Sequence, residues 1–412
     1  MSGKSETADT MKPKAAGATA MNVKASSVKP ARTIQIAQPA TGDEEWQAVR
    51  EPLLSGWLTQ GPQVAAFERA FAERHQVRHA LATTSCTTAL HLAISALGIG
   101  PGDEVVVPSF TWVATANAVL YCGATPVLCD VDRRTYNIDA ASAAAKLTAR
   151  TKAVIAVHLF GLCADVEALR AALPPHVKII EDAACAAGAA RGDVAAGGLG
   201  EVACFSFHPR KAITTGEGGM VVTNDAALAR RADVLRNHGA SISEEQRHSG
   251  PQPYLLAAFD ELGFNYRMTD VQAAIGLVQL GKLDRFIAER DRWARFYREE
   301  LAGIDWLYHP NAPNNGRHAW QAYVTYVEPA RAPSARNDIM AELHRRGVAT
   351  RPGTHAVHAL GYYRERFGCR EDDLPASRDC ERNTMAIPLH NRMSEDDYRY
   401  VVDCIKDIAA RR

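Results

Sequence analysis

The chain has 412 residues, which is enough to bury a large core and to form two domains. Lys and Arg together number 47, as do Asp and Glu, so the formal net charge is zero and nothing indicates binding to nucleic acid or an anionic membrane. No run approaches the roughly 18 uninterrupted apolar residues of a membrane span, so we expect small molecules, with neither nucleic acid nor membrane as a partner.

The first segment and the cysteines indicate where the protein resides. Residues 1–31 are rich in Ala, Lys, Ser, Thr and Gly, lack aromatic side chains and contain no apolar signal-peptide core, so we expect a disordered tail. The nine cysteines form no CxxC pair, and most stand in apolar runs. Buried, reduced thiols fit this pattern and predict a cytoplasmic protein.

From about residue 80 to 225, short β-branched runs alternate with helical segments. Continuous apolar strands that alternate with helices predict an α/β domain, with a mostly parallel sheet covered by helices on both faces. In such a sheet, ligands bind beyond the carboxyl ends of the strands. The expected strands are 105–107, 126–128, 153–157, 177–180, 202–205 and 220–222, and the expected helices are 87–97, 114–121, 140–147 and 165–173.

The second half of the chain predicts a smaller α+β domain. A long helical pattern covers 268–300, and the remainder mixes a strand at 322–327 with helices at 339–346 and 395–409. We therefore expect a large ligand-binding domain over residues 32–285 and a small C-terminal domain over 286–412. The polar, irregular stretch 240–262 is expected to be an insertion near the entrance of the site.

Small hydroxyl residues, Ser85 to Thr88, open the expected helix 87–97 directly after a strand-like run. A helix start of this kind presents free backbone N–H groups and the positive end of the helix dipole, which together can hold a phosphate. Ordinary N-capping is the alternative explanation.

The expected strand 177–180 leads into Glu181 and Asp182. Asp182 can pair with a protonated pyridine nitrogen, or it can cap the next turn. Glu181 is expected to point to the other side, since successive strand residues alternate faces. Trp112 follows the expected strand 105–107, where its ring can stack on a flat cofactor or pack into the core.

Lys211 lies between two expected buried strands, five residues after Ser206 and just before a glycine-rich turn at 216–219. A lysine on such a constrained loop can react with a carbonyl, because burial lowers its pKa and frees the amine. Ser206 can donate a hydrogen bond to a phosphate, and the glycines let the backbone bend beside the lysine. The order of phosphate turn, aromatic ring, strand-end carboxylate, serine and lysine predicts pyridoxal 5′-phosphate (PLP) as the cofactor.

Residues 33–410 resemble the DegT-type sugar aminotransferases, which are fold-type I PLP enzymes. The most specific motifs are SFTWVATANAV, GATPVLCDVD, EDAA, FSFHPRKAITTGEGGMVVTND and GFNYRMTDVQAAIG. The resemblance implies a fold-type I PLP-dependent transferase, in which the large domain binds PLP. It also implies a homodimer with shared active sites.

Carried over by position, the resemblance implies that Lys211 is the Schiff-base lysine and proton shuttle. It makes Asp182 the partner of the pyridine nitrogen and Trp112 the stacking ring. The phosphate ligands that it implies are Ser85, the backbone of Cys86, and Ser206.

The shared active site gives a role to the segment 263–270. Asn265 and Arg267 are implied to reach the phosphate or substrate of the neighbouring subunit. Alternatively, Arg267 pairs with Asp270 within its own loop.

Two positions depart from the family pattern. Cys185, three residues after Asp182, stands where the family often has Gln or His beside the ring hydroxyl, and Cys86 stands where many members have Gly. A thiol is a weak hydrogen bonder, so the contact of Cys185 with the cofactor is in question. A branch of the family that dehydrates its substrate replaces the lysine with histidine, so Lys211 favours amine transfer.

Three histidines are candidate substrate contacts. His355 and His358 have a spacing of three residues but no third ligand nearby, so no metal is expected. The resemblance places their stretch near the substrate. His208, three residues before Lys211, either lies near the cofactor or packs into the core.

The sequence therefore predicts a PLP-dependent aminotransferase that moves an amino group from L-glutamate (or glutamine) to a keto-sugar. The expected acceptor is a nucleotide-linked 4-keto-6-deoxyhexose. The alternatives are an amino-cyclitol (keto-inositol) aminotransferase, other PLP chemistry on the same scaffold, and a non-catalytic regulatory relative. The set of Ser206, Lys211 and Asp182 argues against the last of these.

Overall fold

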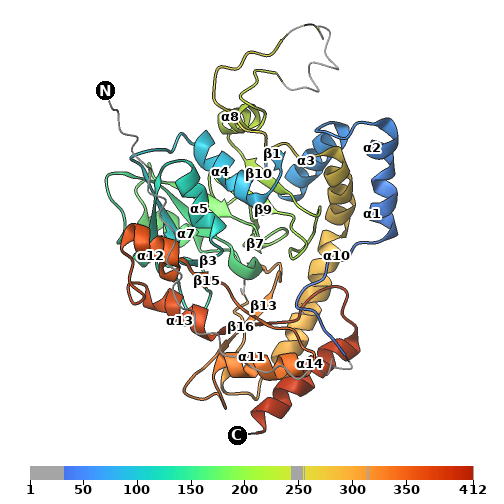
Figure 1. The fold of residues 1–412 in the computed structure, drawn as a ribbon, viewed down its shortest axis with the longest axis vertical. Helices are drawn as coiled ribbons and strands as arrows, with labels where there is room; N and C mark the ends of the chain where they lie inside the picture. Colours follow the sequence, from blue (N-terminus) through green and yellow to red (C-terminus); the bar gives the residue numbers. More distant parts are fainter. Residues whose placement is uncertain (1–31, 243–253, 255, 313–314, 412) are drawn as a thin grey trace, which may run out of the picture.

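The computed structural model describes residues 32–242, 254, 256–312 and 315–411. The expected disordered tail, residues 1–31, lies outside the described residues, as does much of the stretch 240–262. The described chain forms a larger α/β unit and a smaller unit that carries the C-terminal helices (Figure 1).

A seven-stranded sheet in the order β1–β10–β9–β6–β5–β2–β4 forms the centre of the larger unit. Neighbours from β9 to β4 run parallel, whereas β10 runs antiparallel to both β1 and β9, so the mostly parallel sheet predicted from the sequence is confirmed. The strands are β1 (His79–Thr83), β2 (Glu104–Pro108), β4 (Thr125–Cys129), β5 (Thr151–Val157), β6 (Lys178–Asp182), β9 (Val202–Ser206) and β10 (Gly219–Thr223).

The reversed direction of β10 matters for the site. Gly219, its first residue, pairs with Ser206 at the end of β9 and with Thr83 at the end of β1. The start of β10 therefore lies at the same edge of the sheet as the carboxyl ends of the parallel strands, where a ligand is expected.

Alternation of side chains along each strand buries both faces of the sheet, as in the apolar run of β5. Ala153 and Ile155 pack into one hydrophobic cluster, while Val154 and Ala156 pack into another on the opposite face. The first cluster includes helices α4 (Cys86–Ala96), α5 (Ala114–Tyr121) and α8 (Ala226–Arg236). The opposite face is covered by α3 (Pro62–Arg74), α6 (Ala140–Ala144), α7 (Val166–Ala172) and α10 (Asp270–Glu300).

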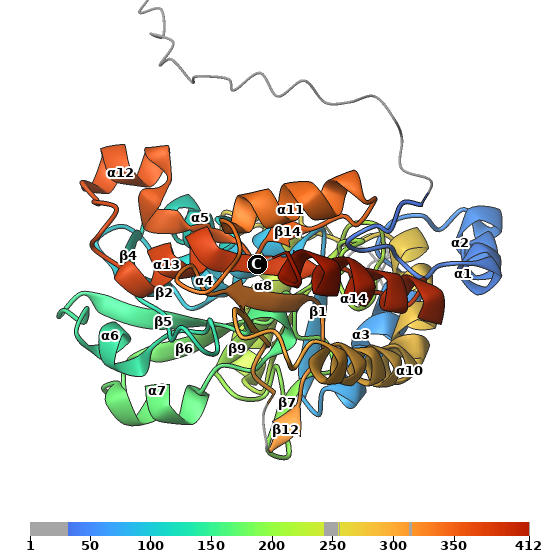
Figure 2. The ribbon, with the colours of Figure 1, turned by 90° about the horizontal axis from the view of Figure 1, so that it is seen from below.

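The smaller unit is built on a four-stranded antiparallel sheet in the order β11–β13–β16–β14. Its strands are β11 (Leu307–Tyr308), β13 (Tyr323–Val327), β14 (Arg351–Pro352) and β16 (Thr384–Ile387), and its helices include α11 (Arg336–Arg345) and α14 (Glu395–Ala409). Helix α14 packs between α11 and α10 (Figure 2).

Two features connect the units. Helix α10 is continuous across residue 285, where the division of domains was expected, so that division stays a prediction. Ile34, near the start of the described chain, is buried in the apolar core of the smaller unit and forms a parallel bridge with Val348.

The remaining elements are short, and they were not predicted from the sequence. They are α1 (Asp43–Ala48), α2 (Arg50–Ser55), β3 (Phe110–Thr111), η1 (Leu159–Gly161), β7 (Ala190–Arg191), β8 (Val194–Ala195), β12 (Gly316–Arg317), β15 (His355–Ala356), η2 (Val357–Ala359), α12 (Gly361–Phe367) and α13 (Pro375–Asn383). Within the described ranges, no helix has the length and apolar character that crossing a bilayer requires.

Candidate active site

A cavity of about 350 Å³ lies at the carboxyl edge of the central sheet, between the sheet and the smaller unit. Its volume falls in the range of small-molecule sites, about 300–1,000 Å³. Most of the residues predicted from the sequence line it: Ser85, Cys86, Trp112, Asp182, Cys185, Ser206, His208 and Lys211.

Lys211 lies on the loop between β9 and β10, and its amide N–H donates to the carbonyl of His208 at 2.8 Å. Gly216 has a φ of 83°, so the glycine-rich turn does bend where a side chain would be strained. The ammonium Nζ of Lys211 donates to Cys185 Sγ at 3.2 Å.

The expected direction of the Lys211 pKa is wrong for the protein without ligand. Burial does lower this pKa, but the charge interaction and hydrogen bond with Cys185, together with the charge of Asp182, outweigh burial and raise it. These neighbours therefore favour the protonated form of the amine.

Asp182 is the last residue of β6 and is buried. Its Oδ2 accepts a 2.7 Å hydrogen bond from Thr115 Oγ1, and its Oδ1 accepts one of 3.2 Å from the amide of Ala184. Thr115 Oγ1 lies 3.1 Å from Thr111 Oγ1, and both threonines are buried. The carboxylate is therefore held in a fixed plane at the wall of the cavity.

The sequence reading had missed the role of Thr115. Its signal was the pair of threonines four residues apart, directly after a strand that ends at the site. Glu181 points away from the cavity, as expected, and accepts hydrogen bonds from His158 Nε2 at 2.8 Å and from three backbone amides of the loop 197–200.

The start of α4 is N-capped by Ser85 and also leaves two backbone amides without a partner among the described residues. The Ser85 hydroxyl caps the helix, because its Oγ accepts from the amide of Thr88 at 3.2 Å. The amides of Cys86 and Thr87 have no hydrogen-bond partner in the part of the chain that the structure describes, so they remain available to an anion.

Gly219 supports this turn from behind. A Cβ at this position would lie 2.4 Å from the carbonyl oxygen of Ser85 and 2.7 Å from the amide nitrogen of Cys86. The start of β10 therefore packs backbone to backbone against the turn, and glycine is the residue that permits it.

The remaining predicted side chains lie around the mouth of the cavity. Trp112 is 60% exposed, and its ring centroid lies 5.8 Å from that of His355, which is also exposed. Ser206 is buried, and its Oγ accepts a long hydrogen bond of 3.4 Å from the amide of His208. Desolvation and the charges of Lys211 and Arg210 lower the pKa of His208, against the opposite effect of Glu217, so the imidazole is favoured in its neutral form.

His358 does not lie where the sequence reading placed it. It is fully buried in η2, with Nδ1 at 2.7 Å from Ser109 Oγ and Nε2 at 3.0 Å from the carbonyl of Glu371. Because both ring nitrogens are engaged and the side chain does not line the cavity, His358 is a structural residue rather than a substrate contact.

Asn265 and Arg267 do not line the cavity of their own chain. Arg267 Nη1 donates to Asn237 Oδ1 at 2.7 Å, and the backbone of Arg267 bridges Thr83 beside the phosphate turn. The alternative pairing with Asp270 is wrong, because the carboxylate of Asp270 accepts from the backbone amides of Gly61, Gln63 and Val64 instead.

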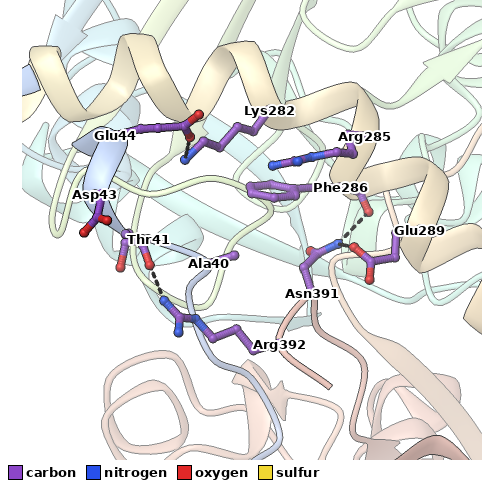
Figure 3. Close-up of a pocket in the computed structure, with 11 residues that line it drawn as sticks. Ala40, Thr41, Asp43, Glu44, Lys282, Arg285, Phe286, Glu289, Asn391 and Arg392 are labelled. Atoms are coloured by element: carbon purple, nitrogen blue, oxygen red, sulfur yellow. Dashed lines mark hydrogen bonds and ion pairs between the residues drawn. The ribbon is translucent and has the colours of Figure 1, made fainter. Parts of the chain in front are cut away.

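A second hollow lies between the first described segment, α10 and the loop after β16 (Figure 3). Several of its charged and polar groups pair with one another: Lys282 with Glu44, Arg392 with the carbonyl of Thr41, and Asn391 with Glu289. Among the described residues that line it, the hollow offers no lysine free to react with a carbonyl, since Lys282 is paired with Glu44 and Glu45, whereas the cavity of Lys211 does.

The cavity fits a phosphorylated pyridine aldehyde. It offers an amine for the aldehyde, a fixed carboxylate for the ring nitrogen, and unpaired amides at a helix N-terminus for the phosphate. Arg210, Gln321 and Arg351 also line it, and the sequence reading had assigned them no function.

Comparisons with known proteins agree with this geometry. Residues 39–406 match the model of the DegT/DnrJ/EryC1/StrS aminotransferase family. The chain is 39% identical over 372 residues to the spore coat polysaccharide biosynthesis protein SpsC of Bacillus subtilis, covering 90% of this chain and 95% of SpsC. It is also 39% identical over 378 residues to GDP-perosamine synthase of Caulobacter vibrioides, covering 91% of this chain and 98% of that enzyme.

Solved structures share the whole architecture. Spr1654 from Streptococcus pneumoniae, assigned as a sugar aminotransferase, superposes in its PLP form with a TM-score of 0.85 at 25% identity, covering 92% of this chain and 99% of that one. The fold is thus that of the fold-type I PLP aminotransferases. By sequence and by structure, the chain belongs to the DegT/DnrJ/EryC1/StrS family of aminotransferases.

Proposed function

We propose that the protein transfers an amino group from L-glutamate (or glutamine) to a keto-sugar, with a nucleotide-linked 4-keto-6-deoxyhexose as acceptor and PLP as cofactor. The observation that carries the proposal is the convergence of Lys211, Asp182 and the start of α4 on one cavity. Two relatives that share 39% of their residues with this chain are named for a perosamine nucleotide and for polysaccharide synthesis, which supports a sugar acceptor.

Each residue of the cavity would have a distinct task. PLP supplies, when bound, a ring that withdraws electrons from the carbon that loses a proton. Asp182 would keep the ring nitrogen protonated, and the amides of Cys86 and Thr87, with Ser85 and Ser206, would hold the phosphate. Trp112 would cover the ring face. Lys211 Nζ would take the proton from the α-carbon of the donor and later deliver a proton to the sugar carbon.

Cys185 would take the place of the usual polar side chain beside the ring. Its Sγ lies 3.2 Å from Lys211 Nζ, so it is within contact distance of whatever the lysine binds. Because a thiol hydrogen-bonds weakly, Cys185 would hold the cofactor less firmly than Gln or His.

A second copy of this chain would complete the site. Asn265 and Arg267 lie beside the phosphate turn but outside their own cavity, which fits a role toward a neighbouring subunit. Large apolar side chains are exposed on α1 and α2, including Trp46 at 63% and Leu54 at 80%, and a dimer would cover such a surface.

The dimer can be tested by mixing two inactive variants, Lys211→Ala and Arg267→Ala, after unfolding and refolding them together. If the site is shared, hybrid dimers contain one site with both residues intact, and activity returns. Activity that stays absent from a mixture with proven hybrid dimers would contradict a shared site.

The nine cysteines all carry free thiols. Several of them are buried, and burial raises the pKa of the Cys86 and Cys204 thiols well above the usual range, so these thiols stay protonated and unreactive. A set of unpaired thiols supports a reducing compartment, and we keep the cytoplasm as the proposed location.

The proposed reaction is tested with purified protein and PLP. L-glutamate and L-glutamine are compared as donors, and GDP- and dTDP-linked 4-keto-6-deoxyhexoses are compared with a keto-inositol as acceptors. We expect turnover with a nucleotide sugar and none by Lys211→Ala, which should also lose the cofactor absorbance of the wild type. Turnover with the keto-inositol alone would favour a cyclitol aminotransferase, and full activity of Lys211→Ala would refute the mechanism.

A further inference from the structure

Two arginines face the cavity from different units of the fold. Arg210 directly precedes Lys211 on the loop after β9, and Arg351 is the first residue of β14 in the smaller sheet. Within the described ranges, neither guanidinium forms an ion pair or a side-chain hydrogen bond, whereas Arg317 and Arg378, for example, pair with carboxylates. Unpaired guanidinium groups that line a cavity are suited to bind an anion.

The backbones that carry these arginines are fixed. The carbonyl of Arg210 accepts a 2.9 Å hydrogen bond from Gln321 Nε2, and its amide donates to His208 Nδ1 at 3.2 Å. Arg351 pairs with Ala386 of β16 in the antiparallel sheet. The positions from which the two side chains extend are therefore set before a ligand binds.

Arg351 lies close enough to Arg210 to be affected by its positive charge. Desolvation, and then the positive charge of Arg210, lower the pKa of Arg351, which places the two cations near one another at the cavity that both line. Among the described residues that line the cavity, the carboxylates are Asp182 and Glu217. Asp182 is already bound by Thr115 and would face the pyridine nitrogen, so at most Glu217 offsets the two arginines.

We propose that Arg210 and Arg351 form one anion subsite at the mouth of the cavity, which binds the charged oxygens of a substrate. The anion is either a carboxylate of the amino donor or the diphosphate of a nucleotide-linked acceptor. Two forked guanidinium groups on separate elements can grip either group with several hydrogen bonds. This inference rests on the proposed function, since that function makes both substrates anionic.

The test uses holoenzyme and two unreactive probes, glutarate for the dicarboxylate donor and inorganic pyrophosphate for the diphosphate. Calorimetry measures the binding of each probe to the wild type, to Arg210→Gln, to Arg351→Gln and to the double variant. Arg69→Gln is the matched control, since Arg69 is an exposed arginine of α3 that does not line the cavity. We expect each single change to lower the binding affinity for one or both probes about tenfold, and the double change to lower it further. The control should bind both probes as the wild type does.

The pattern of loss identifies the source of the anion. Loss of glutarate binding alone assigns the subsite to the donor, and loss of pyrophosphate binding alone assigns it to the acceptor. The proposal is overturned if the double variant binds both probes as the wild type does, if the wild type binds neither, or if the double variant loses PLP in parallel, since the arginines would then serve the cofactor. If probe binding depends on the arginines but the wild type converts no donor, the subsite stands and the proposed function fails.

Discussion

Replacing Gly219 with alanine should damage the phosphate turn without touching Lys211 or Asp182. The added Cβ would lie 2.4 Å from the carbonyl carbon and oxygen of Ser85 and 2.7 Å from the amide of Cys86. Non-bonded carbon atoms need about 3.5 Å, so the turn must move by roughly 1 Å. Overpacking of this kind costs about 1–3 kcal/mol, which corresponds to a loss of PLP affinity of about fivefold to a hundredfold.

The assay titrates apoenzyme with PLP and with pyridoxal, which lacks the phosphate, and follows the absorbance of the cofactor. A displaced turn should weaken the binding of PLP far more than the binding of pyridoxal. The affinity for PLP divided by the affinity for pyridoxal should therefore fall. Gly281→Ala is the matched control, because Gly281 lies in the interior of α10 with no atom within 4 Å of an added Cβ. It should leave both affinities unchanged and, if anything, stabilise the helix slightly. Unaltered PLP binding by Gly219→Ala, or an equal loss of both ligands, would refute the reasoning.

Three further changes probe the same molecule. Thr115→Val removes the hydroxyl that donates a 2.7 Å hydrogen bond to Asp182. A hydrogen bond to a charged group is worth about 1.5–3 kcal/mol, so the variant should bind PLP at least about tenfold more weakly. Thr115→Ser keeps the hydroxyl and should restore PLP binding. Cys185→Ala removes a group that raises the Lys211 pKa, so the reaction of apoenzyme Lys211 with an amine reagent should reach half its maximal rate at a lower pH; an unchanged pH profile would contradict the pairing. His75 is buried, and desolvation lowers its pKa from 6.5 to about 3. As the pH falls below 6.5, the imidazole takes up a proton in the unfolded chain but not in the folded one, so the free energy of unfolding decreases. The titration of His75 should lower the free energy of unfolding by about 2.7 kcal/mol at about pH 4.5. In chemical denaturation, His75→Gln should therefore lose less stability between about pH 7 and about pH 4.5 than the wild type does. An equal loss in both proteins would exclude this effect.

The strands of the central sheet could be predicted from the sequence because their signal is local. Runs such as 153–157 are apolar at every position, short and rich in β-branched residues, as a strand buried on both faces requires. Helix ends were less certain: the helix expected at 140–147 ends at Ala144, as propensity alone does not determine where a helix stops. Asp182 and Ser206 each follow such a local apolar run, so the sequence could place both at the carboxyl ends of strands.

The residues that the sequence could not place depend on contacts between distant segments. Arg351 enters the cavity from the smaller sheet, and nothing near it in the sequence indicates that. The Lys211 pKa was expected to fall because burial could be inferred, whereas the opposing contact with Cys185 arises only when β6 and β9 lie side by side. His355 and His358 are three residues apart, but one is exposed and the other is enclosed in the core.

The bridge between Ile34 and Val348 has a consequence for how the protein can be divided. The amide of Ile34 donates to the carbonyl of Gly347 at 2.8 Å, and Ala349 donates back to Ile34 at 3.0 Å, while Arg32 pairs with Asp397. The smaller unit is therefore assembled from residues near the start of the described chain together with the segment that carries α11 and α14. A fragment expressed from α11 onward would lack part of its own core, and a fusion partner placed directly before residue 32 would lie beside α14 rather than beside the larger unit.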